Sequence, residues 1–283
     1  MLTVCLLLSG PHRLGMLDTA FSSIPLDSPA VSQVLVRHQG GPWTWGGELR
    51  ERIIAHPKVR VVEFTDRAED YAHSFNRTLD LVETPWGLLL PDDDFLIRPA
   101  AKAGFEAAIA HPSAEECGMV AFGWYLFREH RYLATSWKPS GLKSLVSHTP
   151  KFCSTMLNMR RFREVGGFPS MGGFCDTALY GRLAYEYDAL YTDSPVGVYR
   201  MHDGQESARM RTVYAPFVEA LSSSLSRYAR NPFERLAFRR KLASFTHPHT
   251  GSQLIEDLSF WLRARHCPID QNWQFAMRKW SEG

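Results

Sequence analysis

The chain has 283 residues, of which 45% are hydrophobic and 22% are charged, and its formal net charge at pH 7 is +2. These values are typical of a globular protein with one large domain, and they exclude disordered, collagen-like and coiled-coil chains. No apolar run approaches the roughly 18 residues of a membrane span, and residues 1–9 are too short for a signal peptide and carry no basic residue. We therefore expect a cytoplasmic protein.

The five cysteines lie far apart, without a CxxC pair. This pattern predicts reduced, mostly buried thiols rather than a disulfide framework or a zinc site. The cysteines are Cys5, Cys117, Cys153, Cys175 and Cys267.

Apolar runs alternate with segments of helical periodicity in the first part of the chain. Strands are expected at 2–8, 31–36, 59–64 and 86–90, and helices at 14–24, 49–55, 71–81 and 100–111. This alternation predicts an α/β domain with a mainly parallel sheet. Because ligands of such sheets bind beyond the carboxyl ends of the strands, we expect residues 9–13, 37–41 and 92–94 to line one crevice.

Glycine, aromatic residues and short strands become frequent after residue 118. Here the pattern predicts strands at 119–127 and 196–201 and a helix at 174–187. Beyond about Arg209 the pattern is helical throughout. We therefore divide the chain into an α/β domain, residues 1–208, and a helical extension, residues 209–283.

The extension is basic, with 12 Lys or Arg against 6 Asp or Glu, whereas residues 1–208 carry 20 against 24. Between residues 209 and 241 the basic residues are interleaved with aromatic ones. Such a segment can rest on an anionic membrane surface or follow a phosphate backbone. The alternative is a helical cap whose aromatic residues pack on the domain while its arginines face water.

Three adjacent carboxylates, Asp92, Asp93 and Asp94, follow the expected strand at 86–90. They repel one another unless a cation lies among them, and Mg²⁺ and Mn²⁺ prefer oxygen ligands. Magnesium sites usually keep open positions for substrate phosphates. The triplet therefore indicates either a divalent-metal site or a solvated acidic turn.

Two further segments carry candidate site residues. Gly166-Gly167-Phe168 precedes Asp176, whose carboxylate would lie at the positive end of a helix that begins there; a plain helix cap is the alternative. Alternation along the strand at 196–201 places Arg200 and His202 on one side. A histidine there either binds the same cation or is structural.

The order of these segments resembles that of the GT-A nucleotide-sugar transferases of glycosyltransferase family 2. The family shows a small-residue loop, a helical Asn, a D-x-D type motif, a GGF segment, an acidic residue opening an Arg-bearing helix, and a Y-R-x-H…S stretch. Here these are Ser9 to Pro11, Asn76, Asp92–Asp94 with Pro99, Gly166-Gly167-Phe168, Asp176 with Arg182, and Tyr199-Arg200-Met201-His202 with Ser207. The resemblance covers about residues 1–208.

The resemblance implies an α/β GT-A fold, with a Rossmann-like, mostly parallel central sheet flanked by helices and followed here by the helical extension. Residues 1–100 would form the nucleotide-sugar half and residues 101–208 the acceptor half. The implied activity is inverting transfer of a sugar from a nucleotide-diphosphate donor to an acceptor hydroxyl, dependent on Mn²⁺ or Mg²⁺. Such a metal neutralises the departing nucleoside diphosphate.

The resemblance also implies roles for single residues. Asp94 and His202 would bind the metal. Asp176 would be the general base for the acceptor hydroxyl, with a pKa moved toward neutrality in a partly dry, acidic cleft. The donor would be bound by Ser9, Pro11, Asn76, Asp92 and Asp93, and Arg182 and Arg200 would complete the site.

Three departures from the family pattern bear on the donor and the base. The stretch from Val36 to Gly40 lacks the Asp that reads the nucleotide base, so UDP is not implied. Pro91 occupies the first acidic position of the longer motif, and Cys175 replaces the acidic neighbour of the base. Retention of the three aspartates, Asp176 and His202 argues against an inactive member.

The expected partners are a nucleotide-sugar donor and a glycan, small-molecule or modified-DNA acceptor. An enzyme acting on modified DNA bases would hold its substrate with the basic extension, and its binding would depend strongly on salt. A nucleotidyltransferase should show a glycine- and basic-rich phosphate loop, of which residues 9–13 (SGPHR) are a poor version. A non-catalytic nucleotide-binding module would bind nucleotide without turnover.

Overall fold

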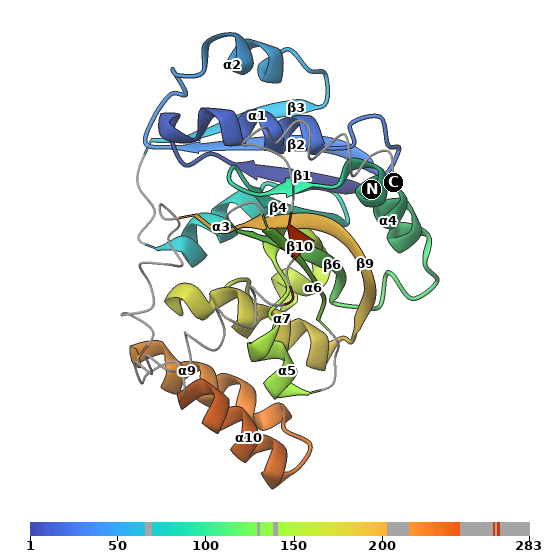
Figure 1. The fold of residues 1–283 in the computed structure, drawn as a ribbon, viewed down its shortest axis with the longest axis vertical. Coiled ribbons are helices and arrows are strands. Elements are labelled where there is room, and N and C mark those ends of the chain that lie inside the picture. The colour runs from blue at the N-terminus through green and yellow to red at the C-terminus, as the bar shows by residue number, and fades with distance from the viewer. Residues whose placement is uncertain are drawn as a thin grey trace.

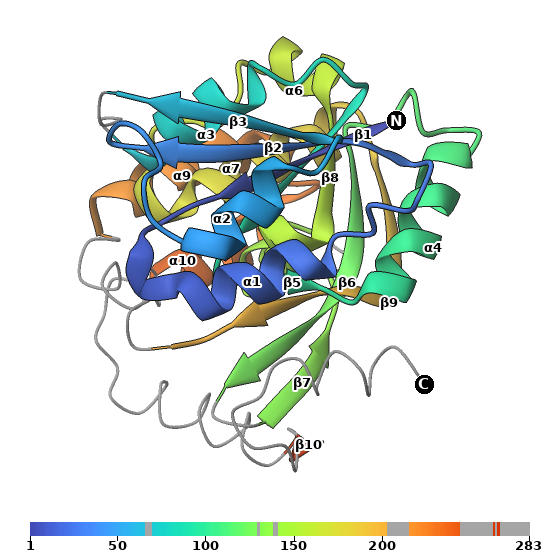
Figure 2. The same cartoon turned by 90° about the horizontal axis from the view of Figure 1, so that it is seen from above.

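The computed structural model describes residues 1–65, 70–128, 131–137, 141–202 and 215–243, together with Arg263 and the pair 265–266. Its centre is a curled sheet that runs from β3 through β1 and β4 to β6 and β7, with helices on both faces (Figures 1 and 2). The arrangement confirms the expected α/β class.

The first part of the sheet is parallel, in the order β3-β2-β1-β4. The strands are β1 (Leu2–Leu7), β2 (Val31–Gln39), β3 (Val59–Phe64) and β4 (Trp86–Pro91). Every residue of β1 is buried, because the strand lies between two neighbours and is covered on both faces. The carboxyl ends of these strands therefore meet at one edge of the sheet.

The second part of the sheet is mixed. β6 (Met119–Arg128) pairs antiparallel with β7 (Arg131–Thr135) and β8 (Thr155–Asn158), and parallel with β9 (Ala189–Arg200). The short β5 (Phe95–Leu96) pairs with the end of β9. That pairing brings the segment after the acidic triplet beside the segment that leads to His202.

Two apolar cores lie on the two faces of the sheet. One core is covered by α1 (Leu14–Ser23), α2 (Gly47–Ile54) and α4 (Arg98–Ala110). The other is covered by α3 (Tyr71–Leu79), α5 (Leu142–Ser147), α6 (Met159–Glu164) and α7 (Cys175–Glu186).

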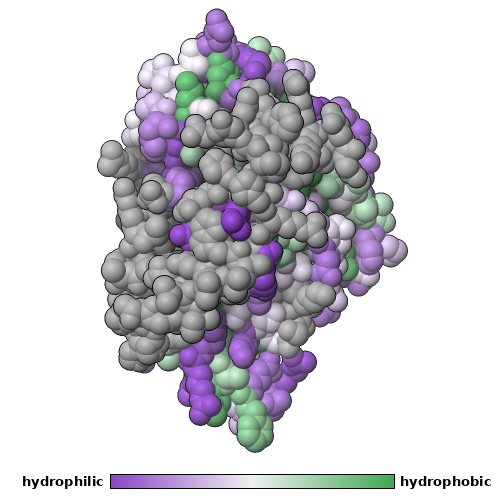
Figure 3. Space-filling view, viewed as in Figure 1, coloured by the Kyte–Doolittle hydropathy of each residue, from purple (hydrophilic) through white to green (hydrophobic). Residues whose placement is uncertain are grey.

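The extension contributes two helices to the second core. α9 (Ala215–Leu225) contacts α7, and α10 (Pro232–Ala243) contacts α5. Leu221, Leu225, Phe238 and Leu242 are buried in the same core as the residues of α7. The lower end of the molecule, where these helices lie, is mainly hydrophilic with a few apolar groups (Figure 3). Within the described part of the extension, these two helices thus pack on the domain as a cap.

The elements expected from periodicity are present, with ends that differ by a few residues, and β9 begins already at Ala189. The expectation that the chain is helical throughout beyond Arg209 is wrong, because residues 265–266 form β10 (Arg265–His266), which pairs with β7. A two-residue strand is set by its partner and leaves no periodic signal.

The cysteines of the described residues are free and buried, as expected: Cys5, Cys117, Cys153 and Cys175. Cys267 and Ser207 lie outside the described residues. Among the helices that the structure describes, none is both long enough and apolar enough to span a bilayer.

Candidate functional site

The acidic triplet lies at the carboxyl end of β4, beside the loop that follows β1. Asp92 accepts hydrogen bonds from the backbone N–H of Ser9 (2.6 Å) and from its hydroxyl (2.9 Å). Both residues follow strands that are paired in parallel, which explains why they meet. Pro11 opens the short helix η1 (Pro11–Arg13), which begins right after this contact.

Arg13 supplies a positive charge at this edge. Its Nη1 lies 3.2 Å from Oδ1 of Asp92 and 2.7 Å from Oδ2 of Asp93, and it also donates to the hydroxyl of Ser9. Sequence reasoning placed Arg13 in the loop but gave it no role. The signal was available, because Arg13 is the one arginine in a short loop that faces three carboxylates.

His202 follows β9 and reaches the same edge from the other side. Its Nε2 lies 3.2 Å from Oδ2 of Asp93. Asp94 points elsewhere: its Oδ1 accepts the backbone N–H of Arg200 at 3.0 Å, and its side chain is buried. The structure therefore brings His202 to Asp93. The sequence resemblance implied that Asp94 and His202 bind the metal together, and this role of Asp94 stays a prediction.

The three carboxyl groups differ in pKa because their surroundings differ. Burial raises the pKa of Asp92, and burial together with the charge of Asp93 raises the pKa of Asp94 well above its ordinary value. Burial acts on Asp93 too, but the hydrogen bond from His202 and the charge of Arg13 outweigh it and lower the pKa of Asp93. Asp93 is thus the carboxylate that keeps its charge most readily.

The donor set fits a divalent cation that a substrate helps to bind. Asp93 and His202 supply an oxygen and a nitrogen close together, and both suit Mn²⁺. Among the described residues no cluster of three His, Cys, Asp or Glu side chains is arranged around one point. Phosphate oxygens and water would have to supply the remaining coordination positions of the cation. Mg²⁺ is commonly bound in this way.

Asp176 lies in the first turn of α7 and is half-buried. Its Oδ1 accepts the backbone N–H of Thr177 at 2.6 Å, so the carboxylate is held at the positive end of the helix. Burial raises the pKa of Asp176, and the charge of Lys151 opposes this rise. A carboxyl with a raised pKa is suited to take up a proton near neutral pH.

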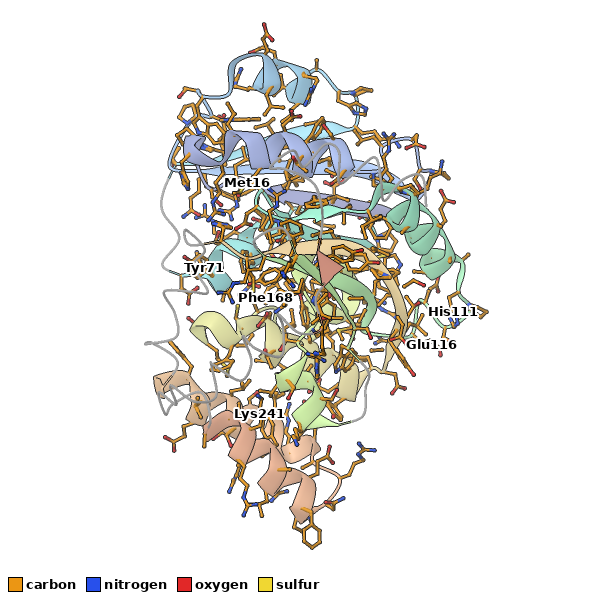
Figure 4. The ribbon with its side chains drawn as sticks, viewed as in Figure 1. Met16, Tyr71, His111, Glu116, Phe168 and Lys241 are labelled. Atoms are coloured by element: carbon orange, nitrogen blue, oxygen red, sulfur yellow. The ribbon has the colours of Figure 1, made fainter. Side chains whose placement is uncertain are left out.

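Asn76 joins α3 to the GGF segment. Its amide donates to the carbonyl of Phe168 (2.9 Å) and accepts the backbone N–H of Phe168 (2.8 Å). Phe168 lies in the middle of the molecule, between the sheet and α7 (Figure 4). The structure thus shows Asn76 shaping the loop ahead of Asp176, and its predicted contact with the donor stays a prediction.

The two predicted arginines have different surroundings. Arg182 donates from Nη1 to the carbonyl of Val165 at 2.5 Å and therefore ties α7 to the end of α6. Arg200 is almost fully buried, with its guanidinium 5.0 Å from the ring centre of Phe95. Burial lowers the pKa of Arg200 to about 10, and the carboxylates of the triplet act in the opposite direction.

Arg37 lies at the end of β2, where the family has its base-reading carboxylate. It is buried and donates to Gln39 at 2.7 Å, and Gln39 in turn accepts the hydroxyl of Ser74 on α3. Burial lowers the pKa of Arg37 to about 10, while the charge of Asp92 opposes the shift. A second guanidinium, besides that of Arg13, thus acts on Asp92 from the strand where the sequence lacks the family's carboxylate.

Comparison with known proteins gives matches at the level of structure. No family model and no curated protein sequence matches the chain. S. aureus TarS (residues 1–349) is similar with a TM-score of 0.64 and 10% identity, over 89% of this chain and 73% of that one. The same protein has been solved in complex with UDP-GlcNAc.

A second similar structure is the mannosyltransferase PcManGT from Pyrobaculum calidifontis, in complex with GDP-Man and Mn²⁺. Its TM-score is 0.58 and its identity 15%, over 99% of this chain and 83% of that one. The fold of this chain is therefore that of the GT-A glycosyltransferases, and the expected resemblance to them is confirmed at the level of the fold.

Proposed function

We propose that the protein is a glycosyltransferase that moves a sugar from a nucleotide-diphosphate donor to an acceptor hydroxyl. The observation that supports this most directly is the meeting of Arg13, the acidic triplet and His202 at the carboxyl ends of β4 and β9, within a GT-A fold. The guanidinium can bind a diphosphate, and the adjacent carboxylates can bind the metal ion that accompanies it.

The donor diphosphate would lie against the loop after β1. Arg13 offers N–H donors to phosphate oxygens there. Asp93, Asp94 and His202 are the residues that would hold Mn²⁺ or Mg²⁺ beside it. When bound, the metal neutralises the charge that develops on the leaving nucleoside diphosphate.

The acceptor would be activated by Asp176. Its carboxylate takes the proton of the acceptor hydroxyl as that oxygen attacks the anomeric carbon. The bond between this carbon and the diphosphate oxygen breaks, so the configuration of the sugar inverts. The raised pKa of Asp176, which burial causes, supports this role because it makes the carboxylate a stronger base.

The acceptor class and the contacts of the extension stay predictions. A glycan, a small molecule and a modified DNA base each offer a hydroxyl, and no described contact favours one of them. Contact of the extension with an anionic surface is likewise a prediction.

A thermal-shift panel of nucleoside diphosphates and nucleotide sugars, each with and without Mn²⁺, tests the donor site. We expect the melting temperature to rise with one nucleotide in the presence of the metal, because a ligand that binds only the folded chain stabilises it. If no member of the panel shifts the melting temperature, the donor site is wrong although the fold stands.

Asp176→Asn tests the base. We expect transfer to fall by about 10²–10⁴-fold while the shift caused by donor and Mn²⁺ is kept, because the amide has a similar size but cannot take the proton. Asp80→Asn, at an exposed position after α3, is the control and should keep full activity. Near wild-type turnover of Asp176→Asn would remove Asp176 from the mechanism.

A further inference from the structure

The helix α10 has a buried face and, opposite to it, an exposed one. Phe238 and Leu242 are buried in the same core as the residues of α7. Because each residue of a helix turns the chain by about 100°, Phe233, Leu236 and Arg240 share the opposite side, which we call the outward face. All three side chains are exposed. The outward face therefore presents two apolar side chains and an arginine.

The exposure of Phe233 and Leu236 is unusual for this chain. Single exposed apolar side chains are common and carry no information by themselves. Among the large hydrophobic residues that the structure describes, however, Phe233 is the most exposed, at 83%, and Leu236 on the same face is 47% exposed. Transfer of both side chains from water to apolar surroundings would be favourable.

The outward face also carries unpaired positive charge. Arg239 and Arg240 are exposed on it, and Arg235 is exposed at its edge. The ion pairs of this part of the chain join other arginines to Glu186 and Glu234. Within the described residues, the guanidinium groups of Arg235, Arg239 and Arg240 form no ion pair, so their charge is available to a partner.

The acidic residue of α10 does not neutralise this face, because it is turned toward the domain. Glu234 accepts the backbone N–H of Leu142 at 3.1 Å, and its other oxygen accepts the backbone N–H and the Nε of Arg230, at 2.8 Å and 3.3 Å. Between residues 215 and 243 the chain has six Lys or Arg and one other acid, Glu219 on α9. The excess positive charge therefore lies on the outside.

The helices α9 and α10 lie at one end of the long axis of the molecule (Figure 1), and apolar groups stand among hydrophilic ones at this end (Figure 3). We propose that the outward face of α10 binds the surface of an anionic phospholipid bilayer. Phe233 and Leu236 enter the boundary between headgroups and acyl chains, while the arginines contact lipid phosphates. Apolar anchors beside basic residues are what holds peripheral helices on such surfaces.

A lipid surface fits the outward face better than a nucleic acid does. Phosphate groups of either partner would attract the arginines. Binding of single strands also relies on several aromatic side chains that stack on bases, whereas this face carries one ring, that of Phe233. Leu236 has no ring to stack, but it contributes to burial in a hydrocarbon layer. Both apolar side chains are therefore used only on a bilayer.

The test is flotation of the whole chain with lipid vesicles, without nucleotide or metal, so its outcome does not depend on the proposed function. One set of vesicles contains phosphatidylcholine alone, and the other contains equal amounts of phosphatidylcholine and phosphatidylserine. We expect binding to the anionic set, and we expect it to weaken as the salt concentration rises, because ions screen the charges.

Two variants separate the apolar from the electrostatic contribution. Phe233→Ala should weaken binding to the anionic vesicles about 10-fold, the lower end of what burial of a phenylalanine contributes. Arg240→Gln should weaken it about 5-fold, the contribution of one basic residue near an anionic surface. Phe233→Ser gives the same comparison as the alanine variant if that variant does not fold.

Ile54→Ala and Arg60→Gln are the matched controls. Ile54 is 36% exposed on α2, and Arg60 is exposed on β3. Both elements lie at the end of the molecule opposite to α10 (Figure 1). The two control variants should bind the anionic vesicles as the wild-type protein does.

The proposal is overturned if the folded wild-type protein does not bind anionic vesicles. It is also overturned if the controls weaken binding as much as Phe233→Ala and Arg240→Gln do. Two other occupants would show themselves in the same series. Binding of duplex DNA without binding of vesicles would assign the face to nucleic acid. A dimer in light scattering that becomes a monomer in Phe233→Ala, again without vesicle binding, would assign it to a second copy of the chain.

Discussion

Asp94 is buried, like the two carboxylates before it, and its surroundings do not favour its charge. It accepts one backbone N–H from Arg200, and burial and the neighbouring charge of Asp93 raise its pKa. In the folded protein without metal, Asp94 therefore holds its proton to a higher pH than in the unfolded chain. Its contribution to stability is present below the ordinary carboxyl pKa and is lost as the pH rises through the raised value.

Asp94→Asn should consequently stabilise the free protein at pH 8, because the amide can accept the same N–H without a charge. Each unit by which the pKa is raised corresponds to about 1.4 kcal/mol. The variant should also lose the extra shift that Mn²⁺ gives with a nucleoside diphosphate. Melting curves at pH 5 and pH 8, with Asp80→Asn as the exposed control, measure both effects. A lower melting temperature at pH 8 would contradict this account of Asp94.

At the same scale, sequence reasoning found the residue types but not their pairing. The triplet, Asp176 and His202 were predicted because acidic and imidazole groups at strand and helix ends are visible in the chain. Which of three consecutive aspartates faces His202 depends on the backbone path of one turn, and no periodicity encodes that.

At the scale of elements, the loop between α6 and α7 is held by Asn76, whose side chain closely approaches the loop backbone. Gly166 and Gly167 both have positive φ, +78° and +75°. A Cβ at Gly167 would lie 2.5 Å from Oδ1 of Asn76, whereas a Cβ at Gly166 would have nothing within 4 Å. The two positions therefore share the conformational requirement of glycine but differ in available space.

Gly166→Ala and Gly167→Ala form a matched pair. Both substitutions should lower the free energy of unfolding by about 1–2 kcal/mol, because the Cβ of alanine disfavours the left-handed conformation that these positions adopt. Gly167→Ala should lose about a further 1–3 kcal/mol, because it displaces Asn76 and leaves buried hydrogen-bonding groups without partners. Urea denaturation of both variants measures the difference. Equal losses would show that Asn76 does not hold this loop.

Element prediction succeeded where a segment carries its own pattern. The long runs of β1 and β4 and the periodic helices α1 and α3 were predicted from the sequence alone. Shorter elements such as β8 and α5 were not predicted, because four or six residues carry too little periodicity and are formed by their partners. The sequence placed the C-terminal helices but did not show that their apolar residues join the core behind α7.

At the scale of the whole molecule, the extension supports the helix that carries Asp176. Gly181 on α7 lets α9 approach, since a Cβ there would lie 2.7 Å from Leu225. Leu225 is fully buried, whereas Leu236 on α10 is 47% exposed. The α/β domain and the helices α9 and α10 should therefore unfold together.

Leu225→Ala should lower the free energy of unfolding by about 2–5 kcal/mol, the range for a buried leucine. Leu236→Ala, the matched exposed change, should lower it by no more than about 0.5 kcal/mol. Calorimetry should show one transition that moves as a whole in Leu225→Ala. If calorimetry instead shows two transitions, and Leu225→Ala lowers the midpoint temperature of only one of them, α9 and α10 form an independent unit.

Arg13 has a consequence for the order in which ligands enter. In the free protein its guanidinium already neutralises Asp92 and Asp93, so a divalent ion arriving alone must compete with a resident cation for the same oxygens. Under the proposed function, a donor diphosphate would offer Arg13 new oxygen partners and release the carboxylates as it binds. The protein should therefore respond to the concentration of the metal–nucleotide complex rather than to that of free metal, and its occupancy in a cell would follow the supply of activated sugar.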